Sequence, residues 1–449
     1  MNGTRRVAGL AIAAALCLVV GSALPRMSLA QAPAGGQDAS GAKPQYTMAE
    51  YNAYTAAQST KDPTQQIKQL DDFVSKYPNS ALLIYVYPLY YNAYSQLKSY
   101  PKVIEYADKL LALGDKVEAP IRYQAYYARA FAYSNLNPPP TDPEQAKKAR
   151  QAALEGLKTL NELKKPDNMS QEDFDKQKKQ PSILFNYTAA NASMVLKDYP
   201  AAIESYKAVL ALTPDDAITH YRIGQAYMAM NPPQQMEAFW SFAKAVTAKG
   251  ANQQQSNQVK TYLRKLLVNY QQAACDNLTD AELNELLQLA GSSADRPASY
   301  SLPSAADLDA ARKDMTIASV IADLKAGGDK AKVTWLAACG LEFPDVPGKL
   351  IEVTPGTDAV QLKVAFVTSD AEFDEKKTPD MDVKVVGQPE AAKLEKDNPV
   401  RFTGTLTSYD PDPFMLHWDK AKVNAEDIPK EKEKGQKKTT KRPTKKPGQ

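Results

Sequence analysis

Residues 198–206 read DYPAAIESY and residues 99–107 read SYPKVIEYA, so a Tyr-Pro pair and an Ile-Glu pair recur in one register. A second match compares YARAFAY, which starts at residue 127, with YRIGQAY, which starts at residue 221; an Asn-Pro-Pro turn follows each of them. Self-similarity of this kind indicates a repeat architecture, in which neighbouring units stack to bury a continuous core. The sequence therefore predicts a stack of repeated helical units.

Helical periodicity broken by short Pro-containing turns extends this pattern over residues 46–291. One more helix is expected over residues 303–327, ended by the Gly327-Gly328 pair. From residue 332 to 428 the pattern changes to β-branched alternation with turn residues, which is typical of strands. The predicted fold class is α+β with more than one domain, a helical solenoid followed by a small β domain, and 449 residues suit that organisation.

Two adjacent units resemble the tetratricopeptide repeat (TPR) family. In that family a small residue in the first helix lets the second helix approach closely, and the second helix carries small, aromatic and small residues. Gly224 and Tyr227 fit the first helix here, and Ala238, Phe242 and Ala245 fit the second. The preceding unit offers the matching residues Ala190, Ala202, Tyr206, Val209 and Pro214.

These two units begin near Ile183 and Ala217, a spacing of 34 residues, which is the period of the family. Earlier units fit less well, and one of them carries Gly156 at a small position of its second helix. The resemblance implies about five helix pairs within residues 46–291, with the helices after residue 252 extending or capping the stack.

The resemblance also implies a concave groove lined by the first helix of each pair. Tyrosine rings would supply contact area, amides would bond to backbone and Met would adapt, which suits an extended or helical peptide. The alternative is that these tyrosines pack between repeats. The groove candidates are Tyr127, Tyr187, Asn191, Met194, Tyr221, Gln225 and Met228.

Five strand-like runs, with a short helical segment at residues 389–394 between the third and the fourth, resemble an OB-fold barrel. A small β-sandwich is the alternative. Phe402, Phe414 and Trp418 could stack on nucleic-acid bases in such a barrel, but the many acids of this region favour a core role for the three rings. The Asp410–Pro413 stretch reads as a turn rather than a Ca²⁺ loop.

Residues 1–30 have the layout of a secretory signal peptide, with Arg5 and Arg6 before an apolar run and small residues at a cleavage site near Ala30. A membrane anchor is the alternative, but the run is short for a spanning helix. Residues 31–45 read as a flexible linker. We therefore expect the periplasm or the exterior of a bacterium as the destination.

Cys275 and Cys339 remain after cleavage of the signal peptide. In an oxidising compartment they can pair, which would tie the end of the helical region to the start of the β region. The alternative is two buried free thiols.

The basic character of the chain belongs to its two ends. The tail, residues 429–449, carries nine Lys/Arg and two Glu from residue 430 onward, and is expected to be disordered. Removing its +7 and the +3 of the signal peptide from the formal total of +3 leaves −7 for residues 31–429. This asymmetry suggests a second function, binding of an anionic glycan, lipid or nucleic acid of the envelope through the tail and the β domain.

Catalytic and metal-binding motifs are missing from the sequence. His220 and His417 are its two histidines, and neither has Cys or His neighbours at metal-ligand spacing. No nucleophile elbow, P-loop or dinucleotide fingerprint occurs. We therefore expect no cofactor and no enzyme activity, but an adaptor or scaffold of the cell envelope that binds a peptide or protein in its groove.

Overall fold

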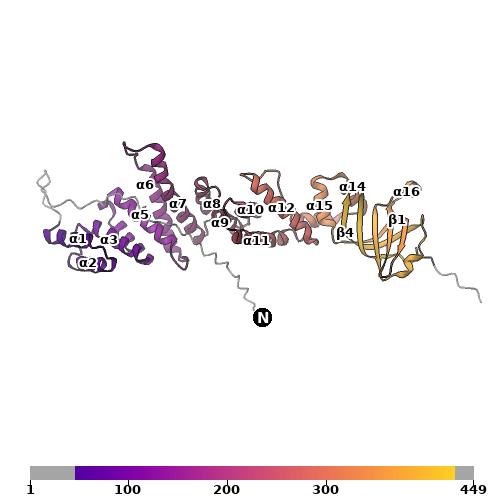
Figure 1. The fold of residues 1–449 in the computed structure, drawn as a ribbon, viewed down its shortest axis with the longest axis horizontal. Helices are drawn as coiled ribbons and strands as arrows, with labels where there is room; N and C mark the ends of the chain where they lie inside the picture. The colour runs from indigo at the N-terminus through magenta and orange to yellow at the C-terminus, as the bar shows by residue number, and fades with distance from the viewer. Residues whose placement is uncertain (1–45, 430–449) are drawn as a thin grey trace, which may run out of the picture. The chain divides into compact units, whose positions relative to one another are not determined.

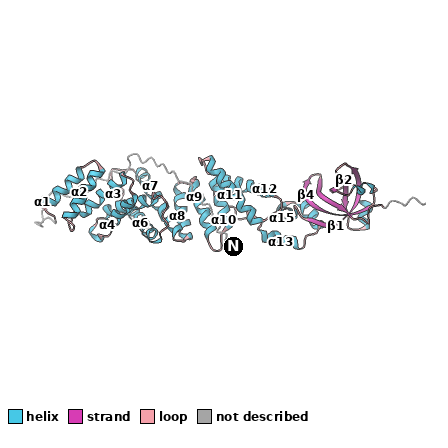
Figure 2. Cartoon of the chain, turned by 90° about the horizontal axis from the view of Figure 1, so that it is seen from below, coloured by secondary structure: helices cyan, strands magenta, loops and turns pink. Residues whose placement is uncertain are grey.

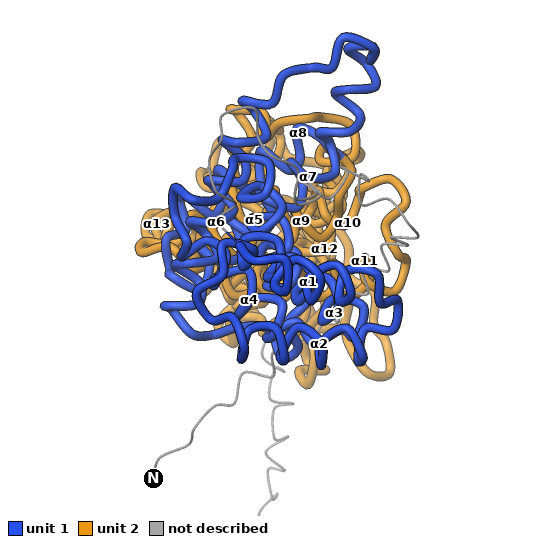
Figure 3. The backbone as a smooth tube through the Cα atoms, turned by 90° about the vertical axis from the view of Figure 1, so that its left-hand side faces the viewer, with its two compact units in different colours: residues 1–214 blue, residues 215–449 orange. Residues whose placement is uncertain are grey.

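The structure is a computed structural model that describes residues 46–429 and falls into two compact units, residues 1–214 and 215–449. Figure 3 colours the two units separately. The predicted signal peptide, the linker and the basic tail from residue 430 onward lie outside the described residues. Helices make up the first unit and the start of the second, and the strands of the described chain follow them, as Figure 2 shows.

The first unit consists of antiparallel helices in which each contacts its successor along the chain (Figure 1). Odd-numbered helices also contact each other, α3 with α5 and α5 with α7, so the pairs stack. With the short 3-10 turn η1 (Gly114–Lys116), the helices are α1 (Met48–Ser59), α2 (Pro63–Lys76), α3 (Leu83–Gln96), α4 (Tyr100–Leu111), α5 (Ala119–Ser134), α6 (Pro143–Glu162), α7 (Gln171–Val195) and α8 (Tyr199–Leu212).

The Pro-containing turns of the sequence are helix starts. Helices α2, α4, α6 and α8 each carry proline in their first turn, where the missing N–H would have no intrahelical partner anyway. Asp62, Asp142 and Asp198 cap three of these helices by accepting a backbone N–H. The recurring turns therefore define where each second helix of a pair begins.

Adjacent helices approach each other closely at two glycines, between neighbouring repeats at Gly156 and within one repeat at Gly224. A Cβ on Gly156 of α6 would lie 2.4 Å from the ring of Phe185 on α7, and both Phe185 and the Phe242 ring are fully buried. A Cβ on Gly224 would lie 2.6 Å from the Phe242 ring. The small residues singled out at 156 and 224 therefore make room for aromatic rings, as the repeat pattern predicts.

The second unit opens with four longer helices and continues with three shorter ones. The four longer helices share one hydrophobic core, in which Phe239, Phe242 and Leu263 are buried. The helices are α9 (Ala217–Ala229), α10 (Gln235–Thr247), α11 (Gln253–Gln271), α12 (Asp276–Ser292), α13 (Ala305–Lys313), α14 (Ile317–Ala326) and α15 (Gly328–Ala338).

The single helix expected over residues 303–327 is two helices, α13 and α14. Ser304 and Thr316 each form a capping box, so the chain contains two helix starts where the periodicity alone suggested one. Gly327 ends α14 with φ +72°, a left-handed conformation that favours glycine, which confirms the predicted stop. The region assigned to strands from residue 332 begins instead with α15, and the first strand starts at Glu342.

The β domain is a closed five-stranded barrel with the strand order β1-β2-β3-β5-β4. All neighbours are antiparallel except β3 and β5, which are parallel. The sequence of elements is β1 (Glu342–Pro355), β2 (Ala359–Phe366), α16 (Asp370–Glu375), β3 (Met381–Val386), the 3-10 turn η2 (Pro389–Lys393), β4 (Pro399–Pro411) and β5 (Phe414–Val423). A closed barrel of five strands agrees with the predicted OB-like fold and replaces the sandwich alternative.

Aromatic residues fill the barrel. The Trp418 ring packs edge-on against Phe402 at 5.3 Å and against Phe343 at 5.7 Å between centroids, and Phe402 and Trp418 are buried. Phe414 is half-buried beside Tyr409. Phe402 and Trp418 therefore belong to the core, as expected, and offer no exposed faces for stacking.

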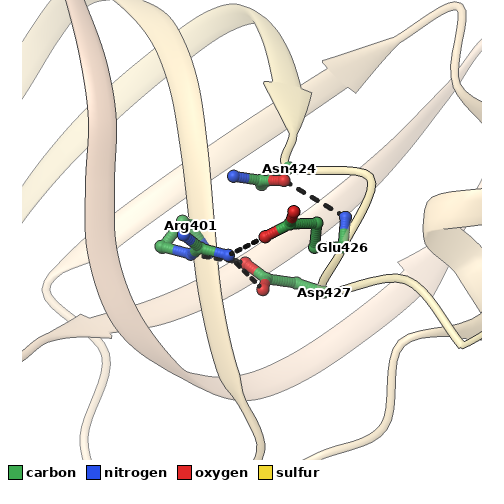
Figure 4. Close-up of polar contacts among 4 residues, drawn as sticks. All are labelled: Arg401, Asn424, Glu426 and Asp427. Atoms are coloured by element: carbon green, nitrogen blue, oxygen red, sulfur yellow. Dashed lines mark hydrogen bonds and ion pairs between the residues drawn. The ribbon is translucent and has the colours of Figure 1, made fainter.

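An ion-pair cluster fastens the chain after β5 back onto β4. Arg401 donates from Nε and Nη2 to Asp427 at 3.2 and 2.9 Å, and its Nη2 lies 3.4 Å from Glu426 (Figure 4). The backbone N–H of Glu426 donates to the side chain of Asn424, which holds the turn between them. These contacts fix the point at which the described chain ends on the barrel.

Cys275 and Cys339 form a disulfide with a Cα–Cα distance of 6.1 Å. Cys275 precedes α12 and Cys339 follows α15, so the bridge closes a loop of 64 residues within the second unit. Next to it, the backbone N–H of Gly340 donates to the carbonyl of Leu406 on β4 at 2.7 Å. The bridge therefore lies where the helices of this unit meet the barrel.

Substituting Gly224→Ala should lower the melting temperature of the protein. The helix propensity of alanine is about 1 kcal/mol more favourable than that of glycine. Over-packing against a buried ring costs about 1–3 kcal/mol, and a contact of 2.6 Å falls in the upper part of that range. Gly291→Ala is the matched control, since a Cβ there lies 3.8 Å from its nearest neighbour. Circular dichroism melts should show a loss for the first variant and none for the second; equal melts would contradict this packing.

Replacing both Cys275 and Cys339 by Ala should destabilise the second unit by about 2–4 kcal/mol, because the open chain regains the entropy of a 64-residue loop. All three tryptophans of the chain, Trp240, Trp335 and Trp418, lie in this unit. Urea unfolding followed by tryptophan fluorescence therefore reports on it. Dithiothreitol should lower the midpoint of the wild type to that of the variant and leave the variant unchanged; a midpoint insensitive to reduction would count against the bridge.

Candidate functional site

The structure distributes the groove candidates over three odd-numbered helices. Tyr127 lies on α5, three candidates lie on α7, and three lie on α9. Helices α5 and α7 belong to the first unit and α9 to the second.

On α7 the candidates are half-buried and follow one face at spacings of four and three residues. Tyr187 packs against Tyr206 of α8, with ring centroids 5.8 Å apart at 69°. The hydroxyl of Tyr206 donates to Oδ1 of Asn191 at 2.6 Å, so the acceptor of that amide is occupied. Its Nδ2 and the side chain of Met194 remain for an outside contact.

Tyr127 of α5 packs instead against a buried ring. Its ring stands perpendicular to Phe185 of α7, with centroids 6.1 Å apart, and burial raises the pKa of its hydroxyl. This is the inter-repeat packing that the sequence left open as the alternative. Tyr127 and the three candidates on α7 are all half-buried.

On α9 the candidates are joined by hydrogen bonds. Nε2 of Gln225 donates to the hydroxyl of Tyr221 at 3.2 Å, and the Tyr221 ring packs against Phe242 at 5.5 Å. Burial raises the pKa of the Tyr221 hydroxyl, so it stays protonated at neutral pH. Met228 is half-buried and packs against the core of this unit.

Arg222, which is not among the residues predicted for the groove, extends this network. Its Nη1 donates to Oε1 of Gln225 at 3.1 Å. A signal was present, since a basic residue stands between two groove candidates on a helix that otherwise presents aromatic, amide and thioether groups. Tyr262 of α11 was missed as well; its ring is 41% exposed and packs against Phe242 at 5.4 Å.

A buried arginine in the first unit is structural. Arg129 of α5 is 1% exposed, and its Nε lies 3.0 Å from the carboxylate of Asp108 on α4. Burial lowers the pKa of Arg129 and raises that of Asp108, which the opposite charge of each partner opposes. Arg129 is enclosed between helices, whereas the side chain of Asp108 is 34% exposed, so the pair presents only its carboxylate to solvent.

Several charged side chains of the barrel lie within ion-pair distance of one another. His417 on β5 lies 2.8 Å from Asp410 and 3.4 Å from Asp382, which also pairs with Lys363 at 3.0 Å. Burial opposes the shift, but hydrogen bonds from Gln361 and Lys363 hold the pKa of Asp382 below its ordinary value. The polymer-binding alternative therefore rests on the charge of the tail, because these described barrel residues pair among themselves.

Metal and membrane sites find no support among residues 46–429. This part of the chain contains no group of three His, Cys, Asp or Glu residues placed to hold a metal ion. Asp410 and Pro411 end β4, and Asp412 and Pro413 form the turn before β5, so the stretch contains the predicted turn. None of the described helices combines the length and the apolar composition that a membrane crossing requires.

A hollow of about 340 Å³ lies between α11 and α12. Arg264 and Lys260 of α11 line it together with Asp280 of α12. Arg264 is already held by Asp280, whose two oxygens accept at 2.6 and 3.1 Å. The guanidinium of Arg264 therefore already has a carboxylate partner within the protein.

Comparison with known proteins assigns the repeats. Residues 190–231, from α7 to the end of α9, match the family model described as TPR repeat. No curated protein matches the chain. A solved structure titled "TPR2AB-domain:pHSP90-complex of yeast Sti1" is 13% identical, covers 54% of this chain and 95% of its own, and superposes with a TM-score of 0.18.

The assignment rests on the matched repeat, on the 34-residue period and on the glycine-to-phenylalanine packing of its helices. Helices before and after residues 190–231 are paired in the same way within each unit. Residues 190–231 therefore match the tetratricopeptide repeat, in a chain whose paired helices are followed by an OB-like five-stranded β-barrel.

Proposed function

We propose that this protein is a non-catalytic adaptor of the bacterial cell envelope that binds a peptide or protein segment on the exposed faces of its first helices. TPR stacks in general present extended concave surfaces to their partners. The observation that carries the proposal is the half-buried series on α7, Tyr187, Asn191 and Met194, and its recurrence on α9.

The recurrence is exact in spacing and in chemistry. Tyr221, Gln225 and Met228 each stand 34 residues after their counterparts on α7. An aromatic ring, a side-chain amide and a thioether therefore occur in the same order on both helices. Core packing alone does not require an amide at a half-buried position, because a polar group there needs a hydrogen-bond partner.

Each group suits a peptide. Nδ2 of Asn191 can donate to a backbone carbonyl, since Oδ1 already accepts from Tyr206 and fixes the orientation of the amide. Tyrosine rings supply area at low conformational cost, and Met adapts to side chains of different shapes. Within each unit the face can therefore hold a short extended or helical segment.

The envelope location is supported by two independent features. Residues 1–30 have the composition of a signal peptide, and the structure joins Cys275 to Cys339. Disulfides persist in the bacterial periplasm and outside the cell but are rare in the cytosol.

Site-specific photocrosslinking tests the binding face. A benzoylphenylalanine residue at position 191 should give discrete adducts with a partner in intact cells, because this position faces the proposed segment. Position 207 is the matched control, since Lys207 is exposed on the second helix of the same repeat. Adducts of equal yield at both positions, or at neither, would remove the support for this face.

Intact mass measurement tests the location. The protein recovered from cells should begin at Gln31, and Cys275 and Cys339 should resist alkylation until a reductant is added. A protein that retains residues 1–30 and free thiols would contradict an envelope location while leaving the binding face untouched.

A further inference from the structure

Three tyrosines of the first unit, Tyr90 and Tyr94 of α3 and Tyr106 of α4, form a stack of nearly parallel rings, named the tyrosine stack below. The rings of Tyr90 and Tyr106 lie 12° from parallel with centroids 3.9 Å apart, and Tyr94 lies 5.5 Å from Tyr106 at 21°. Aromatic pairs ordinarily meet edge-on or offset, with centroids about 4.5–7 Å apart, so packing alone does not favour so close an overlap. Overlapping rings of this kind allow an electron to pass from one ring to the next.

The buried end of the tyrosine stack has a proton acceptor. Tyr90 is 1% exposed, and its hydroxyl donates to Oδ1 of Asp71 on α2 at 2.7 Å. Burial raises the pKa of Tyr90, and the hydrogen bond to Asp71 raises it further, so the phenol is protonated at neutral pH. A phenol that loses an electron becomes a strong acid, and its proton then needs a base within hydrogen-bond reach. Asp71 is that base, and because it is exposed it can pass the proton on to water.

The other end of the tyrosine stack reaches solvent. Tyr94 is half-buried, whereas Tyr106 is 9% exposed and lies between Tyr94 and the buried ring. Nζ of Lys109 lies 4.3 Å from the centroid of the Tyr106 ring, and a positive charge there disfavours the loss of an electron from that ring. An electron vacancy that enters at Tyr94 therefore passes Tyr106 and settles on Tyr90, where loss of the proton leaves a neutral radical.

We propose that the tyrosine stack, with Asp71 as its proton acceptor, is a one-electron donor site for organic peroxyl radicals at the protein surface. Phenols reduce such radicals because the O–H bond that they lose is no stronger than the one that the hydroperoxide gains. The site uses residues of α2 to α4 and does not depend on the proposed peptide binding.

The reaction is stoichiometric and balanced. The peroxyl radical takes one electron from Tyr94 and one proton from water, and it becomes a hydroperoxide. Tyr90 replaces that electron through Tyr106, and the phenolic proton of Tyr90 passes to Asp71 and then to water. In sum, one phenol and one peroxyl radical give one tyrosyl radical and one hydroperoxide. The oxidant never needs to touch the buried ring, because only the electron crosses the tyrosine stack.

Pulse radiolysis of the purified protein tests the site, with trichloromethylperoxyl radicals as the oxidant and with absorption and electron paramagnetic resonance to follow tyrosyl radicals. The wild type should form a long-lived component, because burial shields the Tyr90 radical from other radicals. Tyr90→Phe keeps the ring and should lose this component. Tyr91→Phe is the matched control and should keep it, since Tyr91 is buried next to Tyr90 and its hydroxyl has no hydrogen-bond partner among the described residues.

The role of the carboxylate has its own readout. Asp71→Asn keeps the shape of the acceptor but not the base, and it should slow formation of the long-lived radical about a hundredfold. Asp72→Asn, at the exposed neighbouring position on α2, should react at the wild-type rate. Formation in the wild type should also be slower in D2O, because the proton leaves with the electron. A merely structural role of Asp71 would produce no such isotope effect.

Four results would overturn the proposal. The first is a wild type without a long-lived tyrosyl radical, and the second is the persistence of that radical in Tyr90→Phe. The third is an unchanged rate in Asp71→Asn, and the fourth is an unchanged rate in Tyr94→Phe, which removes the solvent end of the path. Circular dichroism melts of each variant establish that the folded protein is being compared. None of these results bears on peptide binding, so the two proposals fail separately.

Discussion

Close approach of adjacent helices is the constraint on which the repeat region depends. At Gly156 and Gly224 the space of a missing side chain is occupied by the rings of Phe185 and Phe242, both fully buried. Because interiors are packed as densely as organic crystals, a ring can fill that space only if the facing residue has no Cβ. The approach of the two helices in turn decides which residues of the first helix remain half-exposed. The half-buried faces of α7 and α9 are thus a consequence of core packing.

Much of the repeat packing could be predicted from the sequence, because small residues, aromatic residues and prolines recur at fixed spacing. The small residue at 224, the ring at 242 and the prolines of the turns all stand where the structure uses them. Strand order in the barrel was within reach as well, since five alternating runs with a helical segment after the third allow few closed arrangements. The prediction of a single helix over residues 303–327 was wrong. The helical periodicity continues across Asp314, whereas the capping box at Thr316 starts a new helix.

The candidate site was less predictable, because the role of each side chain depends on which residues it contacts and not only on its residue type. Tyr127 and Tyr187 have the same identity and equivalent places in the repeat, yet one packs on Phe185 and the other on Tyr206. Arg222 stands next to a groove candidate in the sequence, but the sequence does not show that the other seven described arginines have carboxylate partners. Ion pairs of this kind join residues far apart in the chain, such as Arg296 and Glu237, and spacing does not reveal them.

The disulfide also determines how the chain can carry mechanical load. A force applied along the polypeptide is transmitted through the disulfide from Cys275 to Cys339, so helices α12 to α15 do not carry it. At about 3.3 Å per extended residue, the 64-residue loop withholds roughly 210 Å of contour length from extension. An adaptor anchored at one end and loaded at the other would keep these helices folded under tension for as long as the bridge is intact.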